Sequence, residues 1–210
     1  MKDAKLITVN LTGANLTKAD LTNILLVDCD LTGATLDRAD LSHADLSQTN
    51  LSGALLGSIK LEKAKLEGAN FTKADFTKTN IKNTKLFGVN FTEAIFPEEY
   101  NLKNTDLSSA IFYKNNLKKA RISNATLIGI NLTDVNLIEA NLEKSTLNLA
   151  VLKEVDLSGA NLKKANFIGA ELTNVSFKGA DLRKANFGRA KLSGVDFTDA
   201  NLKGAIGYLR

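Results

Sequence analysis

The residue types that most often carry out chemistry are scarce in this chain. His43 is its only histidine and Cys29 is its only cysteine. A general base or a metal ligand usually works beside a second group of that kind, and neither residue has a His or Cys neighbour in the sequence. A lone cysteine also excludes an internal disulfide framework. We therefore predict no catalytic constellation, no metal site and no cofactor, and we interpret the chain as a non-enzyme.

Two other motifs resemble functional signatures. Triplets of the type Asn-Leu-Thr or Asn-Phe-Thr match the acceptor pattern for N-glycosylation. Glycines such as Gly13 and Gly33 could belong to a phosphate-binding loop. Both motifs recur with one five-residue spacing, so we interpret the triplets as products of a repeat and the glycines as corner residues that ease unusual φ and ψ angles. The triplets begin at Asn10, Asn15, Asn70 and Asn131.

The repeat itself is a large apolar residue at every fifth position. Leu, Ile or Phe recurs from Leu6 to Phe96 and again from Leu102 to Leu202, and we call each of these residues a centre. A small residue, most often Ala, stands two positions before each centre. On an α-helix, residues five apart point about 140° from each other, and on a flat strand an odd spacing alternates faces. The pattern therefore predicts neither a long helix nor an ordinary sheet.

One geometry keeps every centre inside. The chain would turn through roughly a right angle every five residues and close a square coil every twenty, with adjacent coils paired as parallel strands about 4.8 Å apart. Residues twenty apart should then stack, and Phe71 with Phe91 and Phe167 with Phe187 have this spacing. We predict phenylalanine columns in a core that leaves no concave pocket of enzyme size, and Cys29 should face inward as a core residue.

These residues resemble those of the pentapeptide-repeat proteins. The runs "ANLTKADLTN", "ADLSHADLSQTNLSG" and "GANLKKANFIGAELTN" are typical of that family, and the resemblance covers residues 4 to 205. It implies an all-β fold, a right-handed quadrilateral parallel β-helix of about ten four-sided coils. It also implies a choice of functions, because family members include cyanobacterial regulators and topoisomerase-binding proteins that protect DNA gyrase from quinolones.

The five-residue repeat is interrupted once, in the stretch "FPEEYNL" at residues 96 to 102. The interval from Phe96 to Leu102 is six residues and contains the only proline. We predict a single domain over 1–210, with repeats 4–96 and 100–205 in two registers joined by a bulge. Tyr100 and Asn115 occupy positions meant for small residues, so either a bulge turns Tyr100 outward or the coil widens locally and Asn115 bonds to the backbone. The candidate residues of the break are Pro97, Glu98, Glu99 and Tyr100.

The charges point to one candidate interaction face. The net charge is only +4, but stacking at twenty residues gathers cations around the centres Leu61, Leu102 and Leu182. This ridge starts partway along the chain, since Asp20 and Asp40 occupy its first coils. The next face is nearly uncharged and presents Ile128, Leu149 and Ile168 outward. The cations of the ridge are Lys60, Lys63, Lys82, Lys103, Arg121, Lys144, Lys163, Lys164, Arg183, Lys184 and Lys203.

Two functions fit this surface. The ridge either solubilises the protein or binds an acidic protein surface or polymer, as part of a rod-like interaction scaffold. Sequence-specific nucleic-acid recognition is not expected, because the ridge lacks interleaved aromatic and base-reading side chains. The family resemblance offers the alternative, gyrase binding by DNA mimicry. Mimicry requires an acidic surface, for which an early patch exists at Asp20, Asp28, Asp30, Asp40 and Asp45.

The remaining expectations concern location and association. The start of the chain lacks the apolar run of a secretory signal, and no stretch approaches the length needed to cross a bilayer, so we expect a cytoplasmic protein without membrane contact. An open β-helix exposes unpaired strand edges at its ends. We therefore also expect end-to-end association of copies.

Overall fold

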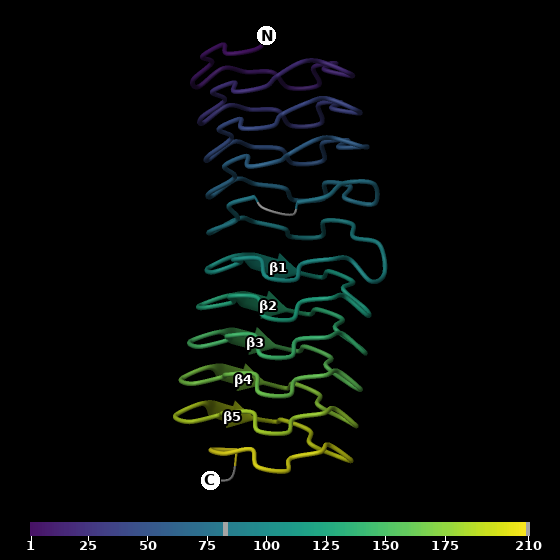
Figure 1. Cartoon of the computed structure of the whole chain (residues 1–210), viewed down its shortest axis with the longest axis vertical. Coiled ribbons are helices and arrows are strands. Elements are labelled where there is room, and N and C mark those ends of the chain that lie inside the picture. The colour runs from purple at the N-terminus through teal and green to yellow at the C-terminus, as the bar shows by residue number, and fades with distance from the viewer. Residues whose placement is uncertain (82–83, 209–210) are drawn as a thin grey trace. The chain divides into compact units, whose positions relative to one another are not determined.

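The computed structural model describes residues 1–81 and 84–208, and it confirms an all-β parallel solenoid. Five short strands form one sheet in the order β1-β2-β3-β4-β5. Successive strands start twenty residues apart and pair in parallel, for example Phe112 with Leu132 in β1 and β2. Figure 1 shows them lying one below another. The strands are β1 (Ile111–Tyr113), β2 (Asn131–Thr133), β3 (Val151–Lys153), β4 (Glu171–Thr173) and β5 (Lys191–Ser193).

The other faces pair through single residues rather than strands. Parallel bridges join residues twenty apart, from Lys5 with Leu25 to Asp75 with Ile95, and from Asn101 with Arg121 to Asn186 with Ile206. Four strand pairings alone give four turns, fewer than the roughly ten predicted. The difference arises because each five-residue face spends most of its length in the corner turn, which leaves one bridging residue on most faces.

The core follows the predicted pattern of centres and small residues. In Leu162 and Ala165, for example, less than 2% of the surface is exposed, while the residues between them face solvent. The phenylalanine columns are confirmed: the rings of Phe167 and Phe187 stack with centroids 4.8 Å apart, and those of Phe177 and Phe197 stack at 5.4 Å. Side chains twenty residues apart therefore stack on one another in the interior.

Most of the described corners are tight turns whose third residue adopts a left-handed backbone. At one such corner Ala14 N–H donates to the Leu11 carbonyl at 2.9 Å, and Gly13 between them has φ of 66°. A positive φ at this position defines a type II turn, for which Gly or Asn is the favoured residue. The sequence also places charged residues there, such as Lys164 with φ of 59°. The left-handed corner is thus a property of the coil, and glycine is optional.

The break divides the structure into two compact units, Met1–Phe96 (unit 1) and Pro97–Arg210 (unit 2). Pro97 precedes a turn at Glu98 and Glu99, so the extra residue lengthens one corner. Tyr100 is only 8% exposed, and its carbonyl accepts the regular bond from Arg121 N–H at 2.9 Å. The alternative in which Tyr100 turns outward is therefore wrong. The single-domain assignment stays a prediction.

Candidate basic interaction face

In unit 2 the predicted cations lie on one face of the solenoid, which we call the basic face. Its centres are Leu102, Ile122, Leu142, Leu162, Leu182 and Leu202, and all but the last are buried. Its cations follow these centres by one or two positions, except Arg121, which precedes Ile122. They are Lys103, Arg121, Lys144, Lys163, Lys164, Arg183, Lys184 and Lys203.

Main-chain hydrogen bonds hold two columns of this face in register. Lys144 N–H donates to the Lys163 carbonyl at 3.0 Å, and Lys164 N–H donates to the Arg183 carbonyl at 2.9 Å. Lys184 N–H continues the series with the Lys203 carbonyl at 3.1 Å. Coils are spaced by about 4.8 Å, so Lys144, Lys164 and Lys184 form one column with one cation per coil, and Lys163, Arg183 and Lys203 form the other.

Only part of this positive charge is neutralised within the chain. The Arg183 guanidinium pairs with the Asp181 carboxylate at an N–O distance of 2.5 Å, and Lys144 Nζ lies 3.7 Å from Glu143 Oε1. The other six cations have no carboxylate oxygen within 4.0 Å in residues 1–81 and 84–208. These six, which we call the unpaired cations, are Lys103, Arg121, Lys163, Lys164, Lys184 and Lys203.

Unit 1 contributes less than the sequence suggested. Lys60 Nζ lies 3.1 Å from Asp40 Oδ2, so its charge is balanced, while Lys63 is exposed at a left-handed corner. Lys82 lies outside the described residues. The twenty-residue spacing that defines the ridge also places Asp40 against Lys60, a signal that was present in the sequence. How the cations of the two units combine remains a prediction.

The early acidic patch is likewise partly neutralised. Lys60 pairs with Asp40, and Lys65 Nζ lies 3.1 Å from Asp45 Oδ2. Hydrogen bonds from the Thr22 and Thr32 hydroxyls hold the pKa values of Asp20 and Asp30 below the ordinary carboxylate value. Ion pairs therefore compensate the charges of Asp40 and Asp45, whereas the lowered pKa values keep Asp20 and Asp30 ionised.

A family model for pentapeptide repeats matches most of the chain in eight copies, and the matched segments include residues 14–53, 54–92, 100–134, 116–153, 130–169, 150–189 and 170–206. The chain belongs to the pentapeptide-repeat family. No curated protein matches its sequence.

Several solved pentapeptide-repeat proteins resemble this one. HetL from the cyanobacterium Nostoc sp. Strain PCC 7120, a protein involved in heterocyst differentiation regulation, is 31% identical over 95% of this chain and 87% of its own, with a TM-score of 0.47. Full-length QnrB1, a plasmid-mediated fluoroquinolone resistance protein, is 16% identical over 96% of this chain and 92% of its own, with a TM-score of 0.46. An Arabidopsis thaliana thylakoid-lumen protein is 28% identical over 67% of this chain and 66% of its own, with a TM-score of 0.19.

His43 and Cys29 occupy different environments in the pentapeptide-repeat coil, one exposed and the other buried. His43 is exposed at a corner with φ of 62°. Cys29 faces inward as predicted, and its Sγ–H donates to the Leu6 carbonyl at 3.3 Å. Among residues 1–81 and 84–208, no group of three or more His, Cys, Asp or Glu side chains could hold a metal ion. The same residues include no helix able to cross a membrane.

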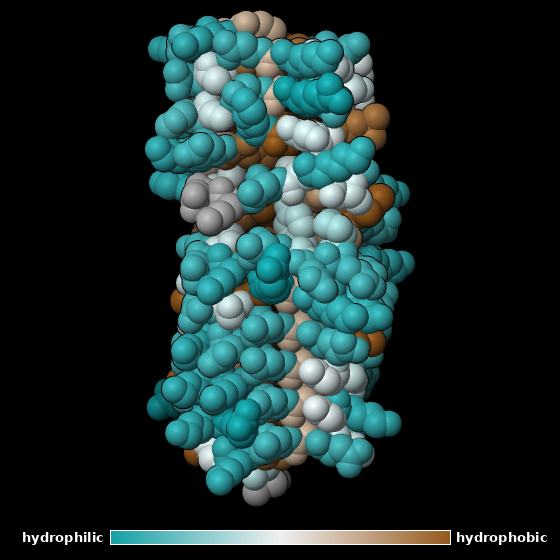
Figure 2. Space-filling model, turned by 45° about the vertical axis from the view of Figure 1, so that its right-hand side comes forward, coloured by the Kyte–Doolittle hydropathy of each residue, from teal (hydrophilic) through white to brown (hydrophobic). Residues whose placement is uncertain are grey.

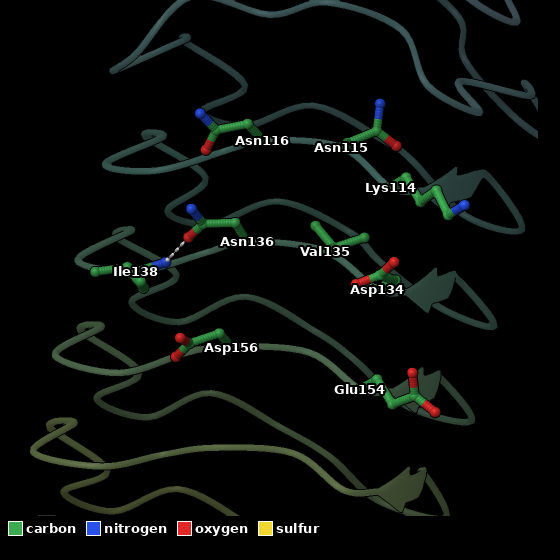
Figure 3. Close-up of a pocket in the computed structure, with 9 residues that line it drawn as sticks. All are labelled: Lys114, Asn115, Asn116, Asp134, Val135, Asn136, Ile138, Glu154 and Asp156. Carbon is green, nitrogen blue, oxygen red and sulfur yellow. Dashed lines mark hydrogen bonds between the residues drawn. The ribbon is translucent and has the colours of Figure 1, made fainter.

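The core is filled as predicted, with a space of only about 10 Å³ among centres such as Leu102, Phe112 and Leu132, and the larger hollows lie outside it. An open groove of about 420 Å³ runs along unit 2 between two columns of side chains. Figure 3 shows Lys114, Asp134 and Glu154 on one side and Asn116, Asn136 and Asp156 on the other, with Asn115 and Val135 between them. A second hollow of about 500 Å³ lies beside Phe197 and Tyr208. Sequence reasoning missed both because it considered only the filled core, whereas corner side chains diverge and leave space outside it.

The break residues of this pentapeptide-repeat chain are tied to the following coil. Glu98 Oε1 lies 3.9 Å from Lys118 Nζ, and Glu99 N–H donates to the Lys118 carbonyl at 3.3 Å. With Tyr100 buried and Pro97 ahead of the turn, these contacts stabilise a lengthened corner. They bring no nucleophile or base together.

The Asp181–Arg183 pair gives a prediction for acid stability. The hydrogen bond from the Arg183 side chain lowers the pKa of Asp181 below its ordinary value of 3.8, so the pair stabilises the fold above the unfolded pKa and this stability is lost as pH falls through the folded pKa. We expect wild type to lose slightly more unfolding free energy than Asp181→Asn between pH 5 and pH 2, by under ~1 kcal/mol because the pair is solvent-screened.

Denaturant titrations at each pH would measure this difference. Asparagine keeps the turn, because Asn161 Oδ1 accepts Lys163 N–H at 3.2 Å in the equivalent position one coil earlier. Equal pH profiles for the two proteins would contradict the prediction.

Proposed function

We propose that this protein is a non-enzymatic interaction scaffold whose basic face in unit 2 binds an acidic partner, either a protein surface or an extended polyanion. The observation that supports this most directly is the set of six unpaired cations. They lie on one face of a backbone fixed by main-chain bonds between coils, so the scaffold holds their attachment points in register and leaves the side chains in solvent.

Several lysines elsewhere in unit 2 behave differently, which favours binding over simple solubilisation. Lys118, Lys119, Lys153 and Lys191 each lie within 4.0 Å of a glutamate, at 3.9, 3.9, 3.9 and 2.6 Å. Lys178 and Arg189 on other faces have no carboxylate within 4.0 Å among the described residues, so cations without a carboxylate partner are enriched on the basic face rather than confined to it. The unpaired cations of the basic face concentrate a positive field where an anion can approach.

The basic face lacks features of the two competing classes of function. It has no aromatic side chain among its outward residues in unit 2, so base stacking is not supported and recognition should follow charge. It also carries no nucleophile and base pair, in keeping with a binding role. Gyrase binding by DNA mimicry has weaker support, since Asp40 and Asp45 are paired with lysines.

The test is retention on immobilised heparin as a function of salt. We expect the variant Lys163→Glu/Lys164→Glu/Lys184→Glu to elute at much lower salt than wild type, and to reduce the slope of log affinity against log salt by about three or more, since each lost ion contact removes about one unit. Glu is tolerated at the left-handed corners, as Glu139 and Glu154 show with φ of 57° and 55°.

A matched control carries the same change in net charge on other faces: Lys119→Glu/Lys153→Glu/Lys178→Glu. We expect this control to retain most of the wild-type affinity. If both triple variants elute together, retention reflects net charge alone and the basic face is not the binding site.

A further inference from the structure

An exposed apolar patch lies on the face that follows the basic face along the chain. Ile128, Leu149 and Ile168 are 40%, 64% and 36% exposed, and they follow the buried centres Leu127, Leu147 and Phe167 by one or two positions. We call these three residues the apolar patch. Most of the protein's visible surface in Figure 2 is hydrophilic. Exposed aliphatic side chains grouped over three successive coils indicate a contact surface rather than chance exposure.

The backbone of Leu149 is a second and independent sign of function. Its φ is 57°, which places a bulky aliphatic residue in the left-handed region. Other non-glycine residues with positive φ in the described chain are polar or charged, so Leu149 is the one aliphatic residue at such a corner. Gly129 and Gly169 occupy the same corner in the adjacent coils. A residue that opposes the local backbone preference, when a neighbouring coil uses glycine, suggests selection for its side chain.

The glycines on either side make Leu149 protrude. The Leu149 Cδ2 atom lies 3.0 Å from the point that a Cβ on Gly169 would occupy, so the leucine rests over the glycine corner of the next coil. No Cβ stands in this corner column at Gly129 or Gly169. Leu149 is therefore a single protruding aliphatic side chain, flanked by two glycine corners that carry no side chain. A side chain of this shape can insert between the side chains of a partner helix.

The basic face borders this patch directly. Lys144 precedes Leu149 by five residues and Lys164 precedes Ile168 by four, across one corner of the coil. Lys184 continues the lysine column one coil further. A partner seated on the patch would therefore have a column of lysines along one edge.

We propose that the occupant of this surface is an acidic amphipathic α-helix of a partner protein, lying along the solenoid axis. Its apolar stripe would cover Leu149 and Ile168, and its carboxylates would meet Lys144, Lys164 and Lys184. This inference rests on the proposed function and narrows its partner class.

The repeat distance of acidic residues on a helix is close to the spacing of the coils, which supports a helical partner. Carboxylates three or four residues apart on a helix recur about every 5.4 Å, and coils recur about every 4.8 Å, so the mismatch over three lysines is about 1.2 Å. Flexible lysine side chains absorb such an offset. Acidic residues on one face of an extended strand recur about every 6.6 Å, which gives a mismatch about three times as large.

The test uses fluorescence anisotropy with synthetic peptides of ~18 residues, or about five helical turns. One peptide carries a glutamate stripe beside a leucine stripe, and a second has the same composition in shuffled order. We expect the striped peptide to bind at least tenfold more tightly than the shuffled one. Poly-glutamate provides a separate readout of the basic face, and its binding should be lost in the lysine charge-reversal variant.

The variant Leu149→Gly separates binding from stability. It removes the knob and relieves the left-handed leucine, so we expect equal or higher thermal stability together with at least tenfold weaker binding of the striped peptide. The matched control Asn174→Gly changes another left-handed corner, with φ of 52°, and should leave peptide affinity unchanged.

Each outcome decides between the two proposals. If poly-glutamate binds but striped and shuffled peptides bind equally, or if Leu149→Gly has no effect, the helix is overturned and the basic face stands. If no acidic probe binds at low salt, the proposed function itself fails. Binding of vesicles rich in anionic lipid that is lost in Leu149→Gly, without preference for the striped peptide, would assign the surface to a membrane and overturn the helix.

Discussion

Replacement of Phe177 by alanine is expected to destabilise the protein by about 3–5 kcal/mol, the range for removing a buried phenylalanine from a packed core. The Phe177 side chain is fully buried, stacks on Phe197 with centroids 5.4 Å apart, and meets the edges of Phe167 and Phe187 at 5.9 Å each. Main-chain bonds fix the coils on both sides, so the structure has little freedom to close the cavity. Urea unfolding followed by circular dichroism would measure the loss.

The conservative control is Phe177→Leu. The centres twenty and forty residues earlier in the same column are Leu157 and Leu137, so the coil accommodates leucine at this position. We expect the leucine variant to lose much less stability than the alanine variant. A cost below about 1 kcal/mol for alanine would mean that the coils relax around the vacancy and that the ring stack contributes little.

The interior of this protein was largely predictable, because one period governs it. Phenylalanines spaced by twenty predict the coil length from the sequence, and the ring stacks of Phe167 with Phe187 and of Phe177 with Phe197 confirm it. The inward position of Cys29 followed from the same count. Large and small inward residues must alternate for a square coil to close, so the sequence has little freedom there.

The exterior was less predictable, because outward positions are free to vary and their contacts depend on neighbouring coils. The Lys60–Asp40 pair can be predicted from the twenty-residue spacing, but a count of cations alone does not reveal it. The left-handed corners were not readable from residue type, since Lys164 and Leu149 both adopt them. The sequence left two alternatives at Tyr100, because a tyrosine is large for a small-residue position, and the structure excludes the outward one by burying the side chain at the start of unit 2.

This contrast explains why we propose binding at the outside of the solenoid. The solenoid repeats the same backbone regardless of which residue occupies a corner, so a cation, a glycine or a leucine can be exchanged there without changing the fold. The basic face and the apolar patch lie on adjacent faces of unit 2, and their outward positions hold cations in the first and aliphatic residues in the second. Both are coupled to the fold only through the register of the coils.

Replacement of Val175 by aspartate should have the largest effect of any single change considered, a loss of more than ~4 kcal/mol at neutral pH, because it puts an unpaired charge in the core. Val175 is 1% exposed and lies at a small inward position in the column of Val135 and Val155. Polar residues are accepted at such positions when they are neutral. Thr79 Oγ1–H donates to the Gly57 carbonyl at 3.0 Å, and Ser145 Oγ–H donates to the Leu142 carbonyl at 2.7 Å.

The variant Val175→Asn isolates the charge, because asparagine has nearly the shape of aspartate and Asn115 is buried in the same column, at 2% exposure. We expect asparagine to cost about 1–3 kcal/mol, the range for a buried polar group that is partly satisfied. Burial raises the pKa of an introduced aspartate, so its excess cost over asparagine should shrink as pH falls below that raised pKa and the carboxyl becomes neutral. Chemical denaturation of both variants at pH 7 and pH 4 measures the difference, and an equal loss for the two at both pH values would show that water reaches the column and that the core is not dry.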